Sequence, residues 1–379
     1  MIIDQLPEIS SVQTTDELPI ERGTTTYKTP VSKLGSGVVS TVLSEISSNA
    51  TPLMDGTAAV GTSTKLARQD HVHPHDSLIV RKNLLDNWYF VGGNTTNAYG
   101  VFPINQRSQG SYTNSGYTVD RWWKSADTTV TVNSGYITYS NPSSGNKDFD
   151  QVLDGAYNGW IGRKLTGSVL LSSGELVYGT LTVPSNAPAN DTGYYPFCDE
   201  QHNIMPRIKV INASVVRFCI RVAKNKSANI VAAKLELGDT QTLCHDVGGS
   251  KVLNEIPDYG EQLRRCQRYL WRLNVGSANM GLGIAYGAGS NASYMVLPNP
   301  VPMVDVAASN ISIVYSSVGA FVLTQTTVAD GFTSTGIANS GSCSLFTSFQ
   351  ISSSGNLSAG TSYRCVLKTG EYILVSRET

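Results

Sequence analysis

Apolar and polar residues alternate along several short stretches between residues 83 and 245, and Gly, Asn and Ser separate these stretches. One of them places four apolar side chains at every second position: Val216, Phe218, Ile220 and Val222. Because successive side chains of a strand point to opposite faces, this pattern predicts strands with one face in a core and the other toward solvent. Several such strands in series predict a β-sandwich or jelly roll.

Residues 258–273 show a helical pattern instead. Their apolar positions are spaced by three and four: Tyr259, Leu263, Cys266, Leu270 and Leu273. This seam covers only about two heptads, which is short for a coiled coil. An amphipathic helix that packs on the sandwich is the alternative interpretation.

The two ends of the chain give weaker patterns. Residues 275–379 return to Gly- and Ser-rich strands, which predict a second β-module. Residues 36–53 have helix-like spacing in a Ser-rich setting, so either a short helix or a connector is expected. Residues 1–35 contain short apolar stretches that are too small for a large core and need a partner surface.

Composition supports an all-β, multidomain chain. The 379 residues exceed the usual size of one core, and 35 glycines with only 15% charged residues favour short strands and turns. The formal net charge of −1 gives no general attraction to nucleic acid or to an anionic membrane. Neither a signal peptide nor a membrane-spanning apolar run is expected.

The six cysteines are scattered, which predicts free, mostly buried thiols in a protein assembled in a reducing cytoplasm.

The sharpest local motif is GTAAVGTSTKLARQDHVHPHD, residues 56–76. It resembles the G-x-A-x-x-G-x-S-x-x-x-A-R-x-D-H-x-H-P motif of tailed-bacteriophage tail-fibre and appendage proteins. The matching residues are Gly56, Ala58, Gly61, Ser63, Ala67, Arg68, Asp70, His71, His73 and Pro74. The resemblance implies a narrow stem on the threefold axis of a homotrimer, where small side chains let three chains approach closely.

Two histidines of this motif form a candidate metal site. On a strand, His71 and His73 would point the same way, about 6.5–7 Å apart. Three chains would then direct six imidazoles at one axis, and similar His-x-His steps in some phage fibre and spike proteins hold iron. Imidazole also suits zinc, so the cofactor is expected to be a transition-metal ion, iron or zinc. Alternatively, both histidines only form hydrogen bonds with Asp70, Arg68 or neighbouring backbone.

A second resemblance covers residues 83–123. The segment is similar to the NLLDN…NQR-G…Y-T-x-DRW opening of phage and prophage fibre modules, whose fold resembles carbohydrate-binding jelly rolls. The residues that carry the match are Asn83, Leu84, Leu85, Asp86, Asn87, Phe90, Asn105, Gln106, Arg107, Gly110, Tyr117, Thr118, Asp120, Arg121 and Trp122. The phrases AKLELGDTQT (233–242) and CQRYLWRL (266–273) also resemble the end of such modules and the helical segment that follows.

Aromatic side chains in this module are candidate platforms for a sugar, because aromatic faces stack on pyranose rings. The candidates are Trp88, Trp123, Tyr157, Trp160, Tyr194 and Tyr195. For each of them burial in the core is the alternative, and Trp122 is expected to be a structural plug. Asp120 with Arg121, and Asp86 with Arg107, are expected to be buried structural pairs.

No enzymatic activity is expected. The acidic residues are few and dispersed, no solenoid repeat appears, and no nucleophile elbow, HExxH or phosphate-binding Gly loop is present.

Together these observations predict an elongated homotrimer of jelly-roll modules joined by a stem and a short helix. The expected segments are a virion-attachment segment 1–50, a stem 51–82, a jelly roll 83–245, a linker and helix 246–274, and a β-domain 275–379. The implied function is a virion fibre that adheres to host surface polysaccharide by multivalent binding. The alternative is a head-fibre, collar or decoration protein without a receptor site. In either case the expected location is the virion, with contacts to other virion proteins through residues 1–50.

Overall fold

A computed structural model describes residues 17–22, 24–30, 80–155, 157–185, 193–289, 291–304, 311–325, 331–340 and 345–378. The chain divides into two units, Met1–Ile79 and Val80–Thr379. Strands make up most of the regular structure of the described residues, so the predicted all-β class is confirmed.

The first unit contains an antiparallel hairpin. Strand β1 (Glu17–Arg22) pairs with β2 (Thr25–Pro30), with Glu17 opposite Pro30 and Arg22 opposite Thr25. The predicted helix at 36–53 and the motif at 56–76 lie outside the described residues.

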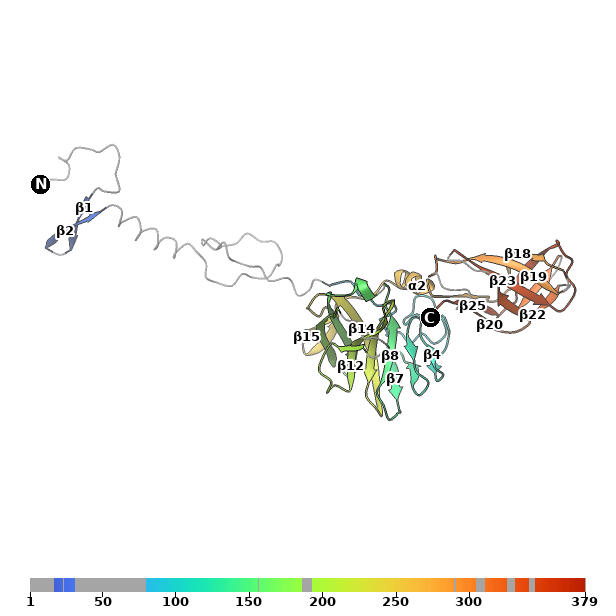
Figure 1. Cartoon of the computed structure of the whole chain (residues 1–379), viewed down its shortest axis with the longest axis horizontal. Helices are drawn as coiled ribbons and strands as arrows, with labels where there is room; N and C mark the ends of the chain where they lie inside the picture. The colour runs from blue at the N-terminus through green and yellow to red at the C-terminus, as the bar shows by residue number, and fades with distance from the viewer. Residues whose placement is uncertain are drawn as a thin grey trace, which may run out of the picture. The chain divides into compact units, whose positions relative to one another are not determined.

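The second unit begins with two six-stranded antiparallel sheets, called the sandwich below (Figure 1). The first sheet contains, in spatial order, β10 (Leu176–Thr182), β9 (Lys164–Leu171), β14 (Lys226–Leu237), β7 (Ile137–Asn141), β6 (Thr129–Val132) and β3 (Ser111–Tyr112). The second contains β11 (Gly193–Pro196), β12 (Ile204–Asn212), β13 (Val215–Val222), β8 (Lys147–Val152), β5 (Trp123–Lys124) and β4 (Gly116–Tyr117). A 3₁₀ turn, η2 (Tyr157–Gly159), lies between β8 and β9.

One hydrophobic core lies between the two sheets. Val216, Phe218, Ile220 and Val222 of β13 are buried in it, as the alternation predicts. Trp122 is fully buried and stacks on Phe149 with ring centroids 4.7 Å apart, so its predicted role as a plug is confirmed.

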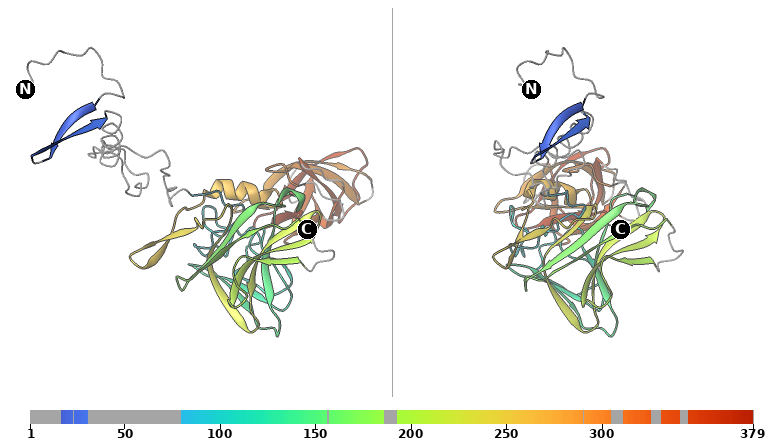
Figure 2. Two further views of the ribbon diagram at one scale, coloured as in Figure 1. Left: turned by 60° about the vertical axis from the view of Figure 1, so that its left-hand side comes forward. Right: turned by 90° about the vertical axis from the view of Figure 1, so that its left-hand side faces the viewer.

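The C-terminal strands form a second core of their own. Strands β17 (Leu270–Asn274), β25 (Tyr372–Ser376) and β20 (Ser312–Tyr315) make a three-stranded sheet. A closed barrel contains, in order, β18 (Met280–Gly287), β19 (Ala292–Pro298), β23 (Phe346–Ser353), β22 (Phe332–Asn339), β21 (Phe321–Thr324) and β24 (Ser362–Leu367). Figure 2 shows these strands in orange to red from two further directions.

The helix α2 is shorter than predicted, because it spans only Tyr259–Gln267. Asp258 caps its N-terminus by accepting the backbone N–H of Glu261 at 2.7 Å. Leu270 and Leu273 of the expected seam belong to β17, because pairing with β25 satisfies the backbone groups of this segment. The two-heptad interpretation is therefore wrong.

Helix α2 packs against the sandwich, in agreement with the alternative interpretation. Cys266 is fully buried with Phe102 and Ile104, and Gln262 accepts the backbone N–H of Asn87 at 2.8 Å. Strands β15 (Cys244–Val247) and β16 (Ser250–Leu253) form a hairpin ahead of the helix. Among the described residues no helix is both long and apolar enough to cross a membrane.

The buried ion pairs have other partners than predicted. Arg121 donates to Asp86 at 2.9 Å, whereas Arg107 lies 4.0 Å from Asp120. Asp120 and Arg121 are consecutive in sequence but have different partners. The Asp120 carboxylate accepts hydrogen bonds from the backbone N–H and from the side-chain amide of Gln106. The expected burial is correct, and the expected pairing is wrong.

Candidate functional site

A charged groove lies on the face of the second sheet that is turned away from the core. Its side chains come from neighbouring strands at matched register: Cys219 of β13 is opposite Arg207 of β12 and Asp150 of β8, and Asp150 is opposite Trp123 of β5. Because paired residues of adjacent strands share a face, these side chains gather on one surface. Tyr194 of β11 joins them through its pairing with Lys209.

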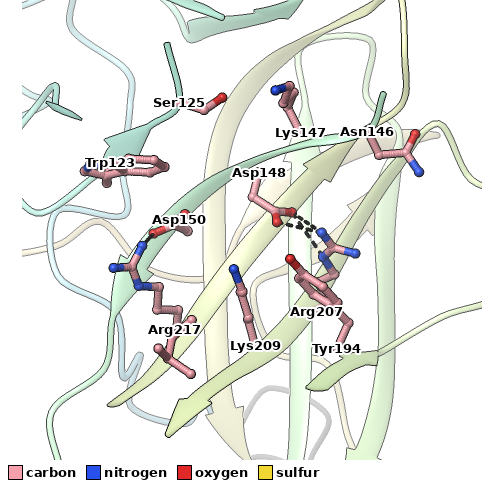
Figure 3. Close-up of a pocket in the computed structure, with 11 residues that line it drawn as sticks. Trp123, Ser125, Asn146, Lys147, Asp148, Asp150, Tyr194, Arg207, Lys209 and Arg217 are labelled. Atoms are coloured by element: carbon pink, nitrogen blue, oxygen red, sulfur yellow. Dashed lines mark hydrogen bonds and ion pairs between the residues drawn. The ribbon is translucent and has the colours of Figure 1, made fainter. Parts of the chain in front are cut away.

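The groove has a volume of about 410 Å³ (Figure 3). Its lining residues are Trp123, Ser125, Asn146, Lys147, Asp148, Asp150, Tyr194, Arg207, Lys209, Ile211 and Arg217. A cavity of this size lies within the range of small-ligand sites.

Two arginine–aspartate pairs organise the groove. Arg207 donates to Asp148 through Nε at 3.0 Å and through Nη2 at 2.7 and 2.6 Å. Arg217 donates through Nη1 to Asp150 at 2.9 Å. The first contact is bidentate, a geometry that fixes the plane of the guanidinium as well as its position. Figure 3 shows Lys209 between the two pairs.

The floor of the groove is buried. Cys219, which lies opposite both Arg207 and Asp150 in the sheet, is fully buried, and burial raises the pKa of its thiol well above the ordinary value, so the thiol is protonated and neutral. Burial also raises the pKa of Asp150 to about 7, against the opposing effect of Arg217. The alternation predicted that the face of β13 turned away from the core is exposed to solvent. This face is in part buried, since Cys219 and Arg221 are both buried there.

Aromatic rings support the cations. The Arg207 guanidinium lies 3.8 Å from the centroid of the Tyr194 ring, and the Arg217 guanidinium lies 5.7 Å from that of Trp123. Such cation–π contacts hold planar groups in fixed orientations. The Lys209 Nζ atom also lies 5.2 Å from the centroid of the Tyr194 ring, so two cations of β12 contact this ring.

This arrangement suits the recognition of a polar, ring-shaped molecule. Oriented guanidinium, ammonium and amide groups donate hydrogen bonds to hydroxyl or oxyanion groups, and the half-buried indole of Trp123 offers an apolar surface.

The structure brings together only two of the six aromatic candidates, Trp123 and Tyr194. Trp88 and Tyr157 are 2% exposed within the core, so their rings cannot stack on a ligand and their assignment as sugar platforms is wrong. Tyr195 is opposite Ile208 and packs against the same core.

Trp160 lines a different, mainly apolar hollow of about 550 Å³. It shares this hollow with Leu84, Arg163 and Leu237, so it forms no part of the groove.

The sequence analysis missed the charged residues of the groove. The available signal was the presence of ionisable residues two positions apart, Asp148 and Asp150 in one segment and Arg207 and Lys209 in another. This spacing shows that these side chains share a face of their own strand, but it cannot show which strands are neighbours.

The candidate metal ligands His71 and His73 lie outside the described residues. Within the described ranges, no group of three or more His, Cys, Asp or Glu side chains is arranged to hold a metal ion.

Comparison of the chain with known proteins adds no family assignment: no family model, no curated protein and no solved structure matches it.

Proposed function

We propose that this chain is a virion fibre protein of a tailed bacteriophage that binds host surface polysaccharide through the groove of its sandwich. The observation that carries the proposal is the groove itself. Trp123, Tyr194 and the two arginine–aspartate pairs form a preorganised polar surface with aromatic walls. Surfaces of this kind recognise saccharides through oriented hydrogen bonds and ring contacts.

The phage assignment is supported by the two motif resemblances, at 56–76 and 83–123. In this proposal residues 1–50 attach to the virion, and residues 51–82 form a trimeric stem. The strand order of the two sheets is compatible with a jelly roll. Three weak sites on one trimer, repeated around the virion, would give firm attachment through avidity.

The proposed activity is binding and not hydrolysis. Asp148 and Asp150 are two residues apart on one strand, so both carboxylates stand on the same wall of the groove. Glycosidases place their two carboxyl groups on opposite sides of the scissile bond. Both aspartates are also already engaged by arginines.

A glycan array probed with the purified full-length chain tests the proposal. Saturable binding to a subset of bacterial polysaccharides is expected, and Trp123→Ala should weaken it by about 1–2 kcal/mol through loss of a ring contact. Tyr178→Ala is the matched control, because Tyr178 is an exposed aromatic residue on the other sheet.

Absence of saturable binding to any glycan or to host cells would contradict the adhesin role. It would favour a purely structural virion role, in which the two ion pairs only stabilise the sheet. Mass photometry tests the trimer separately, since a monomer at micromolar concentration would contradict the proposed stem.

A further inference from the structure

We propose that the groove selects an acidic saccharide, carrying a carboxylate or phosphate group, over a neutral one. This inference rests on the proposed sugar-binding function and names the class of ligand.

The groove has an excess of positive charge. Its lining contains four cations, Lys147, Lys209, Arg207 and Arg217, and two carboxylates, Asp148 and Asp150. Lys147 is also paired with Asp127, just outside the lining, at 3.0 Å, so the local balance is 4 − 3 = +1. The whole chain has a formal charge of −1, so the excess is local. A partly enclosed cavity strengthens such a field relative to open water, and an anionic ligand group would be drawn into it.

The arginines keep donors that their aspartate partners do not use. Arg207 contacts Asp148 through Nε and Nη2, which leaves its Nη1 group outside that pair. Arg217 contacts Asp150 through Nη1, which leaves its Nη2 group outside that pair, whereas its Nε atom is buried and does not face the groove. A guanidinium has five N–H donors in one plane, a geometry that matches the oxygens of a carboxylate or phosphate.

The carboxylates are poor candidates for binding a neutral sugar. Neutral-sugar sites commonly use aspartate as an acceptor for hydroxyl protons, but Asp148 accepts three short contacts from Arg207 and Asp150 is 3% exposed. The groups that face a ligand are therefore mostly donors. Hydrogen-bond donors in a groove of net positive charge bind a negatively charged oxygen group more strongly than a neutral hydroxyl.

Isothermal titration of the full-length chain with three probes tests the inference. The probes are oligogalacturonate, its carboxyl-reduced neutral counterpart, and phosphate-bearing dextran oligomers of similar length. At low salt we expect the uronate or the phosphate probe to bind about tenfold or more tightly than the neutral probe, with the preference falling as salt screens the charges.

Two variants test whether the preference for the acidic probe arises in the groove. Lys209→Gln and Arg217→Lys should each reduce the affinity for the acidic probe about tenfold more than they reduce the affinity for the neutral probe, because the first removes a positive charge and the second removes a planar pair of donors. Lys164→Gln is the control, since it removes one exposed positive charge from the other sheet. Thermal melting of each variant establishes that it is folded.

The outcomes separate this inference from the proposed function. Equal affinity for neutral and acidic probes, or an equal loss in Lys164→Gln, would overturn the inference and leave polysaccharide binding intact. If none of the probes binds and the glycan array also shows no saturable binding, the proposed function itself fails.

Discussion

The carboxylate of Glu378 accepts a hydrogen bond from the backbone N–H of Arg121 at 2.9 Å, across 257 positions of sequence. Its other oxygen accepts from the Arg107 guanidinium. Arg121 has a positive φ of 75°, an uncommon conformation for a residue with a side chain. The segment after β25 therefore closes onto the turn of the sandwich that precedes β5, and the contact helps to hold Arg121 in its conformation.

Replacement of Glu378 by Ala should destabilise the protein. The Glu378 side chain is fully buried and Arg107 is 13% exposed, so the variant leaves a largely buried guanidinium without its closest partner. We expect a loss of about 3 kcal/mol in the free energy of unfolding, measured by urea denaturation. In the control Asp246→Asn, which breaks an exposed pair with Lys251, the loss should stay below about 1 kcal/mol. Equal losses in both variants would contradict the proposed role of Glu378.

Replacement of Lys124 by Met should also destabilise the sandwich. The Lys124 ammonium is fully buried and donates to three backbone carbonyls, those of Thr113 at 2.9 Å, Ser125 at 3.0 Å and Thr128 at 2.7 Å. Methionine keeps the volume but leaves these carbonyls without that donor, at a cost of about 3 kcal/mol. Lys226→Met, at an exposed position of β14, is the control. A melting temperature that is unchanged in Lys124→Met would refute the prediction.

Stability should fall as the pH rises from about 4 to about 7. Burial raises the pKa of Asp120 to about 7 from the ordinary 3.8, against the opposing effect of Arg107. In this window the folded chain therefore holds more protons than the unfolded chain, and a rise in pH favours unfolding. Asp150 shifts in the same direction. Urea denaturation at several pH values measures the slope, which Asp120→Asn should reduce; a slope of opposite sign would show that other groups dominate.

Replacement of Gly179 by Ala should loosen the edge where the two sheets meet. A Cβ atom at Gly179 would lie 1.7 Å from the carbonyl oxygen of Phe197, so the backbone has to move. We expect a loss of about 2–3 kcal/mol, as for other overpacked sites. At Gly145 a Cβ would meet no atom within 4 Å, so Gly145→Ala should change stability by less than about 0.5 kcal/mol. Similar melting temperatures for both variants would contradict this account.

The candidate metal site at His71 and His73 is tested by elemental analysis of the purified full-length protein. The prediction is a bound transition metal, iron or zinc, whose removal by a chelator lowers the melting temperature. His73→Ala should lower both metal content and melting temperature. A metal-free protein, with the same melting temperature in His73→Ala, would leave only hydrogen bonds as the role of these histidines.

The sequence alone was sufficient for the all-β class and for the core face of individual strands. Val216, Phe218, Ile220 and Val222 lie in the core because their spacing matches the period of a strand, and this period is a local property. Free, mostly buried thiols were likewise predictable, since Cys219, Cys244, Cys266 and Cys365 are buried and unbridged among the described residues.

The end of α2 and the partners of the buried charges required the tertiary structure. The apolar spacing continues through Leu270 and Leu273, and nothing local ends the helix there; the distant strand β25 competes for the same backbone groups. Likewise, Asp86 and Arg121 are brought together only when the chain folds. The type of a side chain predicts its charge, but it does not predict which way the side chain points or which partner it meets.

The groove shows the same division. The sequence predicted that Arg217 belongs to a strand of alternating character, since that depends on neighbours one and two positions away. Only the tertiary structure decided that β5, β8, β12 and β13 lie side by side in register, and so that Trp123, Asp150, Arg207 and Arg217 line one groove. Strand order depends on contacts between residues far apart in the chain, which no local pattern encodes.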